Sequence, residues 1–235
     1  MRASIFVSLV LSVWVGGLAA DTRAEELKIK AGDKIVAIGD SITQGGGYLR
    51  DMNAVFTNQY PDLKIPPVVN AGISGQKAEQ LVKRFDQDVI QKKPAVVTIN
   101  VGINDVWHRL NKPHDETVLK AYKENVAKMV DDAQKAGILV VLCTPTIITE
   151  DLQSEGNKRL LLYVDAMKQI ATEKKCLLAD LHAAFVSVLG KKPADAKGKA
   201  FTGDGVHMNA KGNWVMAEGI LKTLGVPQAK IDACK

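Results

Sequence analysis

Five short apolar runs, separated by helix-like segments, constrain the fold of this chain more than any other feature of its sequence. The runs cover residues 34–38, 68–71, 95–101, 138–143 and 176–181, and they are rich in Val, Ile and Leu. Continuous apolar runs of this length are typical of strands that are buried on both faces of a parallel sheet.

The segments between the runs have the apolar periodicity of amphipathic helices. Two such faces are formed by Val118, Tyr122, Val126, Met129 and Ala133, and by Leu160, Val164, Met167 and Ala171. A closing helix is expected over residues 210–224. Alternating strand and helix signals predict an α/β fold, in which helices cover both faces of a parallel sheet.

The first 20 residues differ in character from the rest of the 235-residue chain. Residues 3–20 carry no charge, follow Arg2 and end in small residues, which predicts a signal peptide cleaved after Ala19 or Ala20. The rival interpretation is an uncleaved membrane anchor, but the run is slightly short for a span and ends in glycines. We therefore expect an exported protein, periplasmic or extracellular, with one domain over residues 21–235. No later stretch predicts membrane insertion.

Charge and cysteine content limit the other possibilities. The formal net charge of +5 is scattered along the chain, without the aromatic and basic patch that would favour nucleic-acid binding.

The odd number of cysteines leaves at least one of Cys143, Cys176 and Cys234 unpaired. Cys143 and Cys176 are expected at opposite ends of parallel strands. We favour buried free thiols and leave a Cys176–Cys234 pair open. No His/Cys cluster has the spacing of metal ligands, and no cofactor is expected.

Polar motifs follow three successive apolar runs. Ser41 lies in Gly-Asp-Ser-Ile after the first run, residues 70–72 close the second, and residues 102–105 (Gly-Ile-Asn-Asp) follow the third. Because the carboxyl ends of parallel strands share one edge of a sheet, these motifs are expected to meet there.

The residue types at this edge suit the transfer of an acyl group to water. Ser41 is a candidate nucleophile, His207 its general base, and Asp204 the residue that orients the imidazole. The backbone N–H groups of Ser41 and Gly72 and the side-chain amide of Asn104 are candidate donors to an oxyanion. The structural alternatives are helix caps for Ser41 and Asp204, a turn for Asn104 and a positive φ for Gly72.

Together, the four motifs resemble those of the SGNH hydrolases, the group that contains the GDSL esterases and lipases. Ser41, Gly72, Asn104 and His207 occur in the order of the four family blocks, with Ile42 where the family name has Leu. The resemblance implies a flavodoxin-like, three-layer α/β/α fold with a parallel five-stranded sheet. It also implies ester or thioester hydrolysis without a cofactor. The Gly-x-Ser-x-Gly elbow of the α/β-hydrolases is absent, because Thr43 replaces its second glycine.

The leading hypothesis is a secreted serine esterase that acts on small or soluble esters, preferably O-acetyl groups on carbohydrates. Trp107 and His108, just past the third motif, are candidate substrate-binding residues. Lysophospholipase or thioesterase activity is the alternative within the enzyme class. A carbohydrate-binding module that has the same fold but no catalysis is the alternative from another class.

Overall fold

The computed structural model describes residues 26–191 and 198–235. The predicted signal peptide, residues 1–20, lies outside these described residues. So does a short part of the polar segment that precedes Asp204, residues 192–197.

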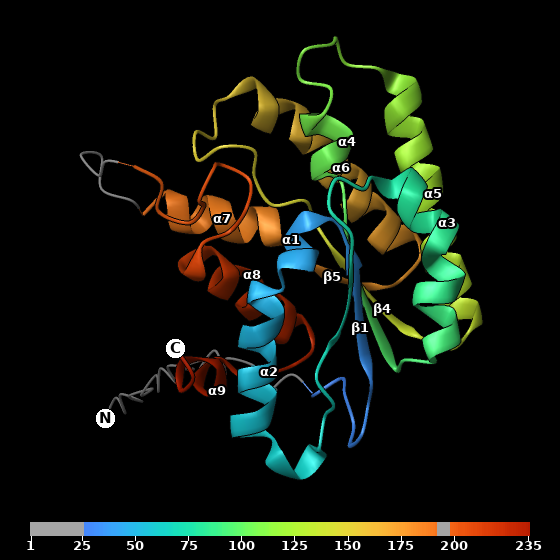
Figure 1. Ribbon diagram of the computed structural model, residues 1–235, viewed down its shortest axis with the longest axis vertical. Helices are drawn as coiled ribbons and strands as arrows, with labels where there is room; N and C mark the ends of the chain where they lie inside the picture. Colours follow the sequence, from blue (N-terminus) through green and yellow to red (C-terminus); the bar gives the residue numbers. More distant parts are fainter. Residues whose placement is uncertain (1–25, 192–197) are drawn as a thin grey trace, which may run out of the picture.

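Five parallel strands form one sheet in the order β2-β1-β3-β4-β5 (Figure 1). They are β1 (Ile35–Gly39), β2 (Val69–Gly72), β3 (Val96–Asn100), β4 (Leu139–Cys143) and β5 (Leu177–Ala179). Each strand begins one residue after the start of the corresponding apolar run. The strand prediction is therefore confirmed, and so is the flavodoxin-like order.

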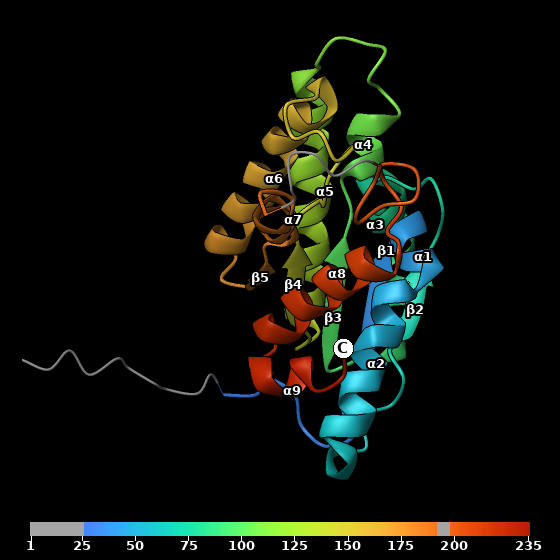
Figure 2. The same cartoon turned by 90° about the vertical axis from the view of Figure 1, so that its left-hand side faces the viewer.

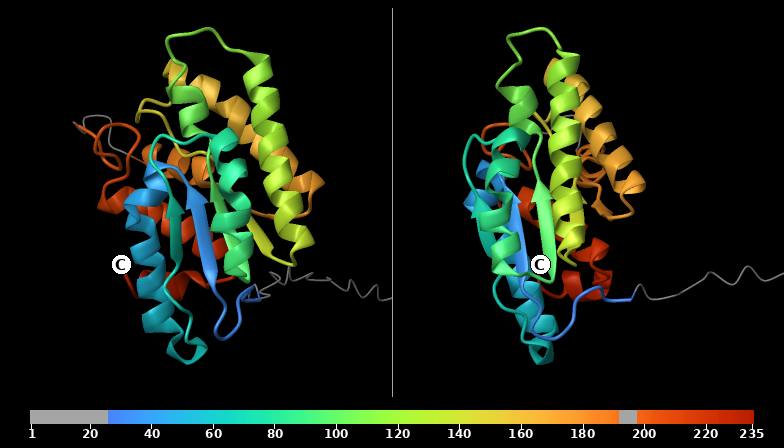
Figure 3. Two further views of the ribbon diagram at one scale, coloured as in Figure 1. Left: turned by 45° about the vertical axis from the view of Figure 1, so that its right-hand side comes forward. Right: turned by 90° about the vertical axis from the view of Figure 1, so that its right-hand side faces the viewer.

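Helices cover both faces of this sheet, as the alternating pattern predicts (Figures 1 and 2). On one face, α8 (Ala210–Thr223) packs against α2 (Gly47–Gln59) and α7 (Leu181–Leu189). On the other, α5 (Glu116–Lys135) lies between α3 (Ala78–Asp88) and α6 (Glu155–Glu173), and Figure 3 shows α3 and α5 side by side. Crossovers between parallel strands are right-handed, so the direction of each crossover decides which face its helix covers. The chain moves from β1 to β2 in one direction and later from β3 to β5 in the other, which places helices on both faces.

Shorter elements complete the described chain. They are α1 (Ser41–Gly45), η1 (Pro61–Leu63), η2 (Ile90–Lys92), α4 (Ile103–Trp107) and α9 (Gln228–Asp232). Two of them, α1 and α4, follow directly on the carboxyl ends of β1 and β3. No helix in the described ranges is long and apolar enough to cross a membrane.

The core lies between the sheet and the two helical layers. Every residue of β1 and β3 is buried, and so are Leu160, Val164, Met167 and Ala171 of the predicted α6 face. The expectation that all five strands are buried on both faces is wrong for β2, whose residues are half-buried or exposed, and for β5, where Leu177 and Leu178 are half-buried. The reason is position, because β2 and β5 are the outer strands of the sheet and each has one neighbouring strand instead of two.

The strand register aligns the carboxyl ends of β1, β2 and β3, where the polar motifs begin. Gly39 at the end of β1 pairs with Gly72 on one side and with Asn100 on the other. The chain then leaves these strands toward Ser41 and Asn104 at the same edge of the sheet.

The three cysteines are free thiols, as favoured from the sequence. Cys143 ends β4 opposite Ala179, whereas Cys176 precedes the start of β5. The two residues therefore stand toward opposite ends of neighbouring strands.

Candidate active site

Ser41 is the first residue of α1, directly after β1 and the N-cap residue Asp40. The Asp40 carboxylate accepts a hydrogen bond of 3.0 Å from the backbone N–H of Ile42 and so caps the helix. Burial raises the pKa of Asp40 to about 6, although the Ile42 N–H and the charge of His207 favour its ionised form. Asp40, and not Ser41, is therefore the cap of this short helix.

His207 connects Ser41 to Asp204. The Nε2 atom of His207 lies 2.8 Å from Ser41 Oγ, and its Nδ1 atom lies 2.6 Å from Asp204 Oδ2. A carboxylate only accepts, so Nδ1 carries the proton in the neutral imidazole and Nε2 is free to accept the proton of Ser41. This is the protonation pattern that a serine nucleophile requires of its base.

Asp204 is held in its ionised form. Partial burial opposes ionisation, but the His207 side chain and the backbone N–H groups of His207 and Val206 hydrogen-bond to the carboxylate. These bonds keep the pKa of Asp204 well below its usual range. The cap of α8 is Asn209, whose side chain accepts from Gly212 N, so Asp204 does not cap the final helix.

The two predicted oxyanion donors beyond Ser41 lie at the same sheet edge but already have partners. The Gly72 N–H donates to Asn70 Oδ1 at 2.9 Å. The buried amide of Asn104 donates through Nδ2 to the carbonyl oxygen of Gln76 at 3.1 Å and has a second N–H. A bound oxyanion would have to compete with Asn70 for the Gly72 N–H.

Gly72 is required here for close approach, not for a positive φ. A Cβ atom at this position would lie 2.1 Å from Gln44 N and 2.6 Å from the carbonyl carbon of Thr43. Both are backbone atoms of α1, so the end of β2 can pack against α1 only if residue 72 has no side chain.

Trp107, one of the two predicted substrate-binding residues, lies beside the histidine of this site. The Trp107 side chain is 38% exposed, and its ring meets the His207 ring edge-on with centroids 6.1 Å apart. The His108 ring lies 6.0 Å from that of Trp107. The structure thus places Trp107 next to His207, and His108 next to Trp107.

A small cavity of about 150 Å³ opens at Ser41 and His207. Its other lining residues are Ile42, Gly45, Gly47, Arg50, Met208 and Asn213. Sequence reasoning missed Arg50, because a single exposed arginine in an amphipathic helix carries no distinctive signal.

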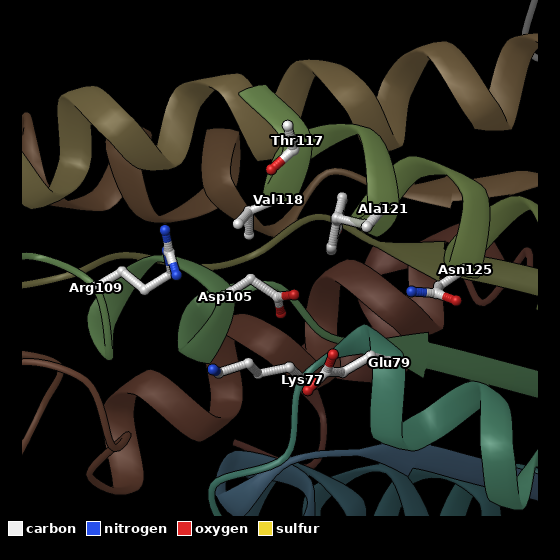
Figure 4. A pocket seen from close by; sticks show the side chains of 9 residues that line it. Lys77, Glu79, Asp105, Arg109, Thr117, Val118, Ala121 and Asn125 are labelled. Atoms are coloured by element: carbon white, nitrogen blue, oxygen red, sulfur yellow. The ribbon is translucent and has the colours of Figure 1, made fainter. Parts of the chain in front are cut away.

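A larger cavity of about 360 Å³ lies between α3 and α5, and Lys77, Asp105 and Arg109 are among its lining residues (Figure 4). Neither Ser41 nor His207 lines it. Burial raises the pKa of Asp105 to about 7, against a backbone hydrogen bond from Ala78 and the charge of Lys77. The chemistry, and not the volume, therefore identifies the smaller cavity as the candidate active site.

The second aspartate–histidine pair of the sequence is structural. Asp180 caps α7 by accepting from Ala183 N. His182 is buried and donates from Nδ1 to the carbonyl oxygen of Thr146 at 2.6 Å. In the part of the chain that the structure describes, no group of three or more His, Cys, Asp or Glu side chains is placed to hold a metal ion.

A family model for GDSL-like lipases and acylhydrolases matches residues 37–215, which include Ser41, Gly72, Asn104, Asp204 and His207. The chain belongs to this GDSL family. The match confirms the resemblance that the four motifs indicated, and it identifies the chain as an ester hydrolase by family.

Relatives within the GDSL family cover most of the chain. An acetylxylan esterase of Geobacillus stearothermophilus is 33% identical over 85% of this chain and 97% of its own length. The uncharacterized lipoprotein YqeF of Bacillus subtilis (strain 168) is 27% identical over 80% of this chain and 88% of its own.

Solved structures agree with the observed fold. The crystal structure of Axe2, an acetylxylan esterase from Geobacillus stearothermophilus, has a TM-score of 0.75 at 32% identity, over 84% of this chain and 96% of that one. LAE5, an α/β-hydrolase enzyme from the metagenome of Lake Arreo, has a TM-score of 0.76 at 28% identity, over 86% and 99%. Catalytic mutants of Axe2 have alanine in place of a serine, an aspartate or a histidine. Ser41, Asp204 and His207 are residues of these same three types.

Proposed function

We propose that this GDSL-family chain is an exported serine esterase that removes O-acetyl groups from carbohydrates. The observation that carries the proposal is the continuous line of hydrogen bonds from Ser41 Oγ through the His207 imidazole to the Asp204 carboxylate. A serine hydroxyl becomes a useful nucleophile when a base of this kind accepts its proton.

In the proposed reaction, Ser41 Oγ attacks the carbonyl carbon of the ester while His207 Nε2 accepts the hydroxyl proton. The ester C–O bond then breaks, and His207 returns the proton to the leaving alcohol. Water attacks the resulting acyl-enzyme with His207 again as base, which releases the carboxylic acid and restores Ser41. Asp204 keeps the imidazole oriented and stabilises its charged form.

The tetrahedral intermediates carry a negative oxygen that needs donors. We assign this role to the N–H groups of Ser41 and Gly72 and to the Asn104 amide. The Gly72 N–H exchanges its bond to Asn70 for one to the oxyanion. Such preorganised donors typically contribute about 10²–10³ in rate each.

Two observations favour a short acyl group on a sugar. The cavity of about 150 Å³ beside Ser41 is small for a long acyl chain. The half-exposed Trp107 ring offers an apolar face next to His207, of the kind that packs against a sugar ring. The 33% identical relative is an acetylxylan esterase, which supports the same choice. Export is proposed from the uncharged segment over residues 3–20 alone.

The test is acetate release from acetylated xylooligosaccharides by the chain from residue 21, with Ser41→Ala as the matched variant. We expect turnover in the wild type and nearly none in Ser41→Ala, with an unchanged melting temperature. Equal turnover in both proteins would contradict the assignment of Ser41.

A series of p-nitrophenyl esters of increasing chain length tests the acyl group. Acetate is expected to react fastest. A wide preference for long chains would instead favour a lysophospholipase or thioesterase. Recovery of unaltered acetylated carbohydrate after binding would favour a non-catalytic carbohydrate-binding module.

A further inference from the structure

Glu150, in the segment between β4 and α6, binds the backbone of the loop that carries Asp204 and His207. Its Oε2 atom accepts from Ala200 N at 2.7 Å. Its Oε1 atom accepts from Phe201 N at 2.7 Å, from Thr202 N at 2.9 Å and from the Thr202 hydroxyl at 3.0 Å. One carboxylate thus fixes three consecutive residues of what we call the histidine loop, residues 198–209.

The backbone on both sides of Glu150 is held in place by hydrogen bonds to the Asn157 side chain. The buried amide of Asn157, in the first turn of α6, donates to the carbonyl oxygens of Thr149 at 3.2 Å and Asp151 at 2.7 Å. Asn157 Oδ1 accepts from Ile148 N at 2.8 Å. The backbone on both sides of Glu150 is therefore anchored to α6, so the position of the carboxylate is determined by the fold.

The anchored end of the histidine loop is coupled to His207 within the loop. Thr202 and Met208 form an antiparallel bridge. Gly203 N donates to the carbonyl oxygen of His207 at 2.8 Å, and Asn209 N donates to that of Phe201 at 3.0 Å. A shift of residues 200–202 would therefore move the His207 backbone with it.

A second link joins the same two segments. Thr149 N donates to the carbonyl oxygen of Gly205 at 2.8 Å. Gly205 has a φ of +109° and lies between Asp204 and His207 in sequence. The Thr149–Gly205 bond holds the loop between Asp204 and His207, whereas Glu150 holds residues 200–202.

We propose that Glu150 is a positioning residue that holds the histidine loop so that His207 Nε2 stays within hydrogen-bond distance of Ser41 Oγ. The inference rests on the proposed function, because it assigns His207 the role of the base. None of the hydrogen bonds given above joins Glu150 to the reacting atoms, and its proposed effect is exerted through the loop. The hydrogen bonds from Ala200, Phe201 and Thr202 outweigh the effect of burial and lower the pKa of Glu150, which favours the ionised carboxylate.

The experiment compares Glu150→Ala and Glu150→Gln with wild type, and with Glu173→Gln as the control. Glu173 is an exposed residue near the end of α6 that accepts from Gln169. The measurements are kcat and KM for p-nitrophenyl acetate, thermal unfolding, and the low-field proton NMR signal of the His207 Nδ1–H that is bonded to Asp204.

For Glu150→Ala we expect kcat to fall by up to about 10²-fold, since small misplacements of a reacting group reduce the rate this much. KM should change less than about twofold, because substrate contacts are untouched. The His207 signal should weaken in parallel. Glu150→Gln keeps one acceptor oxygen but presents an NH₂ group to a backbone N–H, so it should fall between wild type and Glu150→Ala. Glu173→Gln should match wild type.

Full kcat and an intact His207 signal in either Glu150 variant would overturn the proposal, even if the variant unfolds at a lower temperature. If Glu150→Ala fails to fold, Glu150→Gln decides by the same two readouts. A wild type without esterase activity would contradict the proposed function, and the NMR signal would still decide whether Glu150 positions His207.

Discussion

The Arg84 guanidinium donates a hydrogen bond of 3.0 Å from Nη2 to the carbonyl oxygen of Gly39, the last residue of β1. Its Nη1 atom donates to the carbonyl oxygen of Ala71 on β2 at 2.8 Å and pairs with Asp88 at 2.7 Å. One arginine of α3 thus ties together the two strand ends that lead to Ser41 and Gly72.

Replacing Arg84 with alanine should therefore destabilise the protein and disturb the site. Loss of these charged hydrogen bonds is expected to lower the free energy of unfolding by about 2–3 kcal/mol. Arg84→Lys should recover only part of the lost free energy of unfolding. Lysine keeps the positive charge, but its ammonium group lacks the planar fork with which arginine reaches both carbonyl oxygens. Urea unfolding of the three proteins measures the effect. Equal midpoints for Arg84→Ala and wild type would show that the two strand ends need no such tie.

Gly72→Ala should be more damaging than most glycine substitutions, because the new Cβ would meet the α1 backbone at 2.1 Å. Either α1 or β2 must shift, so both the melting temperature and kcat should fall. Gly45→Ala is the matched control, since a Cβ there meets nothing within 4 Å. Thermal unfolding of the two variants compares them directly. Similar melting temperatures would contradict the predicted clash.

Asp204→Asn should lower kcat by about 10²–10⁴-fold, because an amide no longer selects the imidazole tautomer that accepts the Ser41 proton. Since hydrogen bonds hold the pKa of Asp204 below its usual range, its protonation should not set the acid limb of the wild-type pH–rate profile. Rate profiles with p-nitrophenyl acetate test both points. An acid limb that disappears in Asp204→Asn would mean that Asp204 itself titrates there.

Asp105 should make the protein less stable as the pH rises. Burial raises its pKa from the ordinary value of 3.8 to about 7 in the folded protein. Between these values the folded state binds more protons than the unfolded state, so the free energy of unfolding falls with rising pH. Asp105→Asn should remove this contribution and be more stable than wild type at pH 8, by on the order of 2 kcal/mol.

Urea unfolding from pH 4 to pH 8 tests the Asp105 prediction. Some slope should remain in Asp105→Asn, because burial also raises the pKa of Asp40, to about 6, and acts in the same direction. Identical slopes in wild type and Asp105→Asn would show that Asp105 is ionised at little cost in the folded protein.

Trp107→Ala should raise KM for esters of sugars more than KM for simple esters. Loss of an aromatic contact of about 0.5–1.5 kcal/mol should raise KM for acetylated xylooligosaccharides roughly 2- to 10-fold. KM for p-nitrophenyl acetate, which lacks the sugar, should change less. Leu161→Ala is the control, because it removes a similarly exposed apolar side chain from α6 instead of from the residues beside His207. It should leave KM for both substrates unchanged. An equal change for both substrates would argue against sugar binding at Trp107.

The strands and the positions of the motifs could be predicted from the sequence because their signals are local. Continuous apolar runs such as residues 95–101 specify buried strands, and the residue after such a run must lie at the sheet edge. The order of Ser41, Gly72, Asn104 and His207 along the chain was enough to indicate the family.

The sequence did not determine the contacts between these motifs, because they depend on distant segments. Ser41 and His207 are 166 residues apart, and only the folded sheet and the histidine loop bring them to 2.8 Å. No local pattern in the sequence predicts the hydrogen bonds between Glu150 and residues 200–202, or that between Arg84 and Gly39. A single Glu or Arg in an amphipathic or loop segment is compatible with any exposed position. The partial exposure of β2 was likewise decided by tertiary packing, because its place at the side of the sheet leaves it one neighbouring strand.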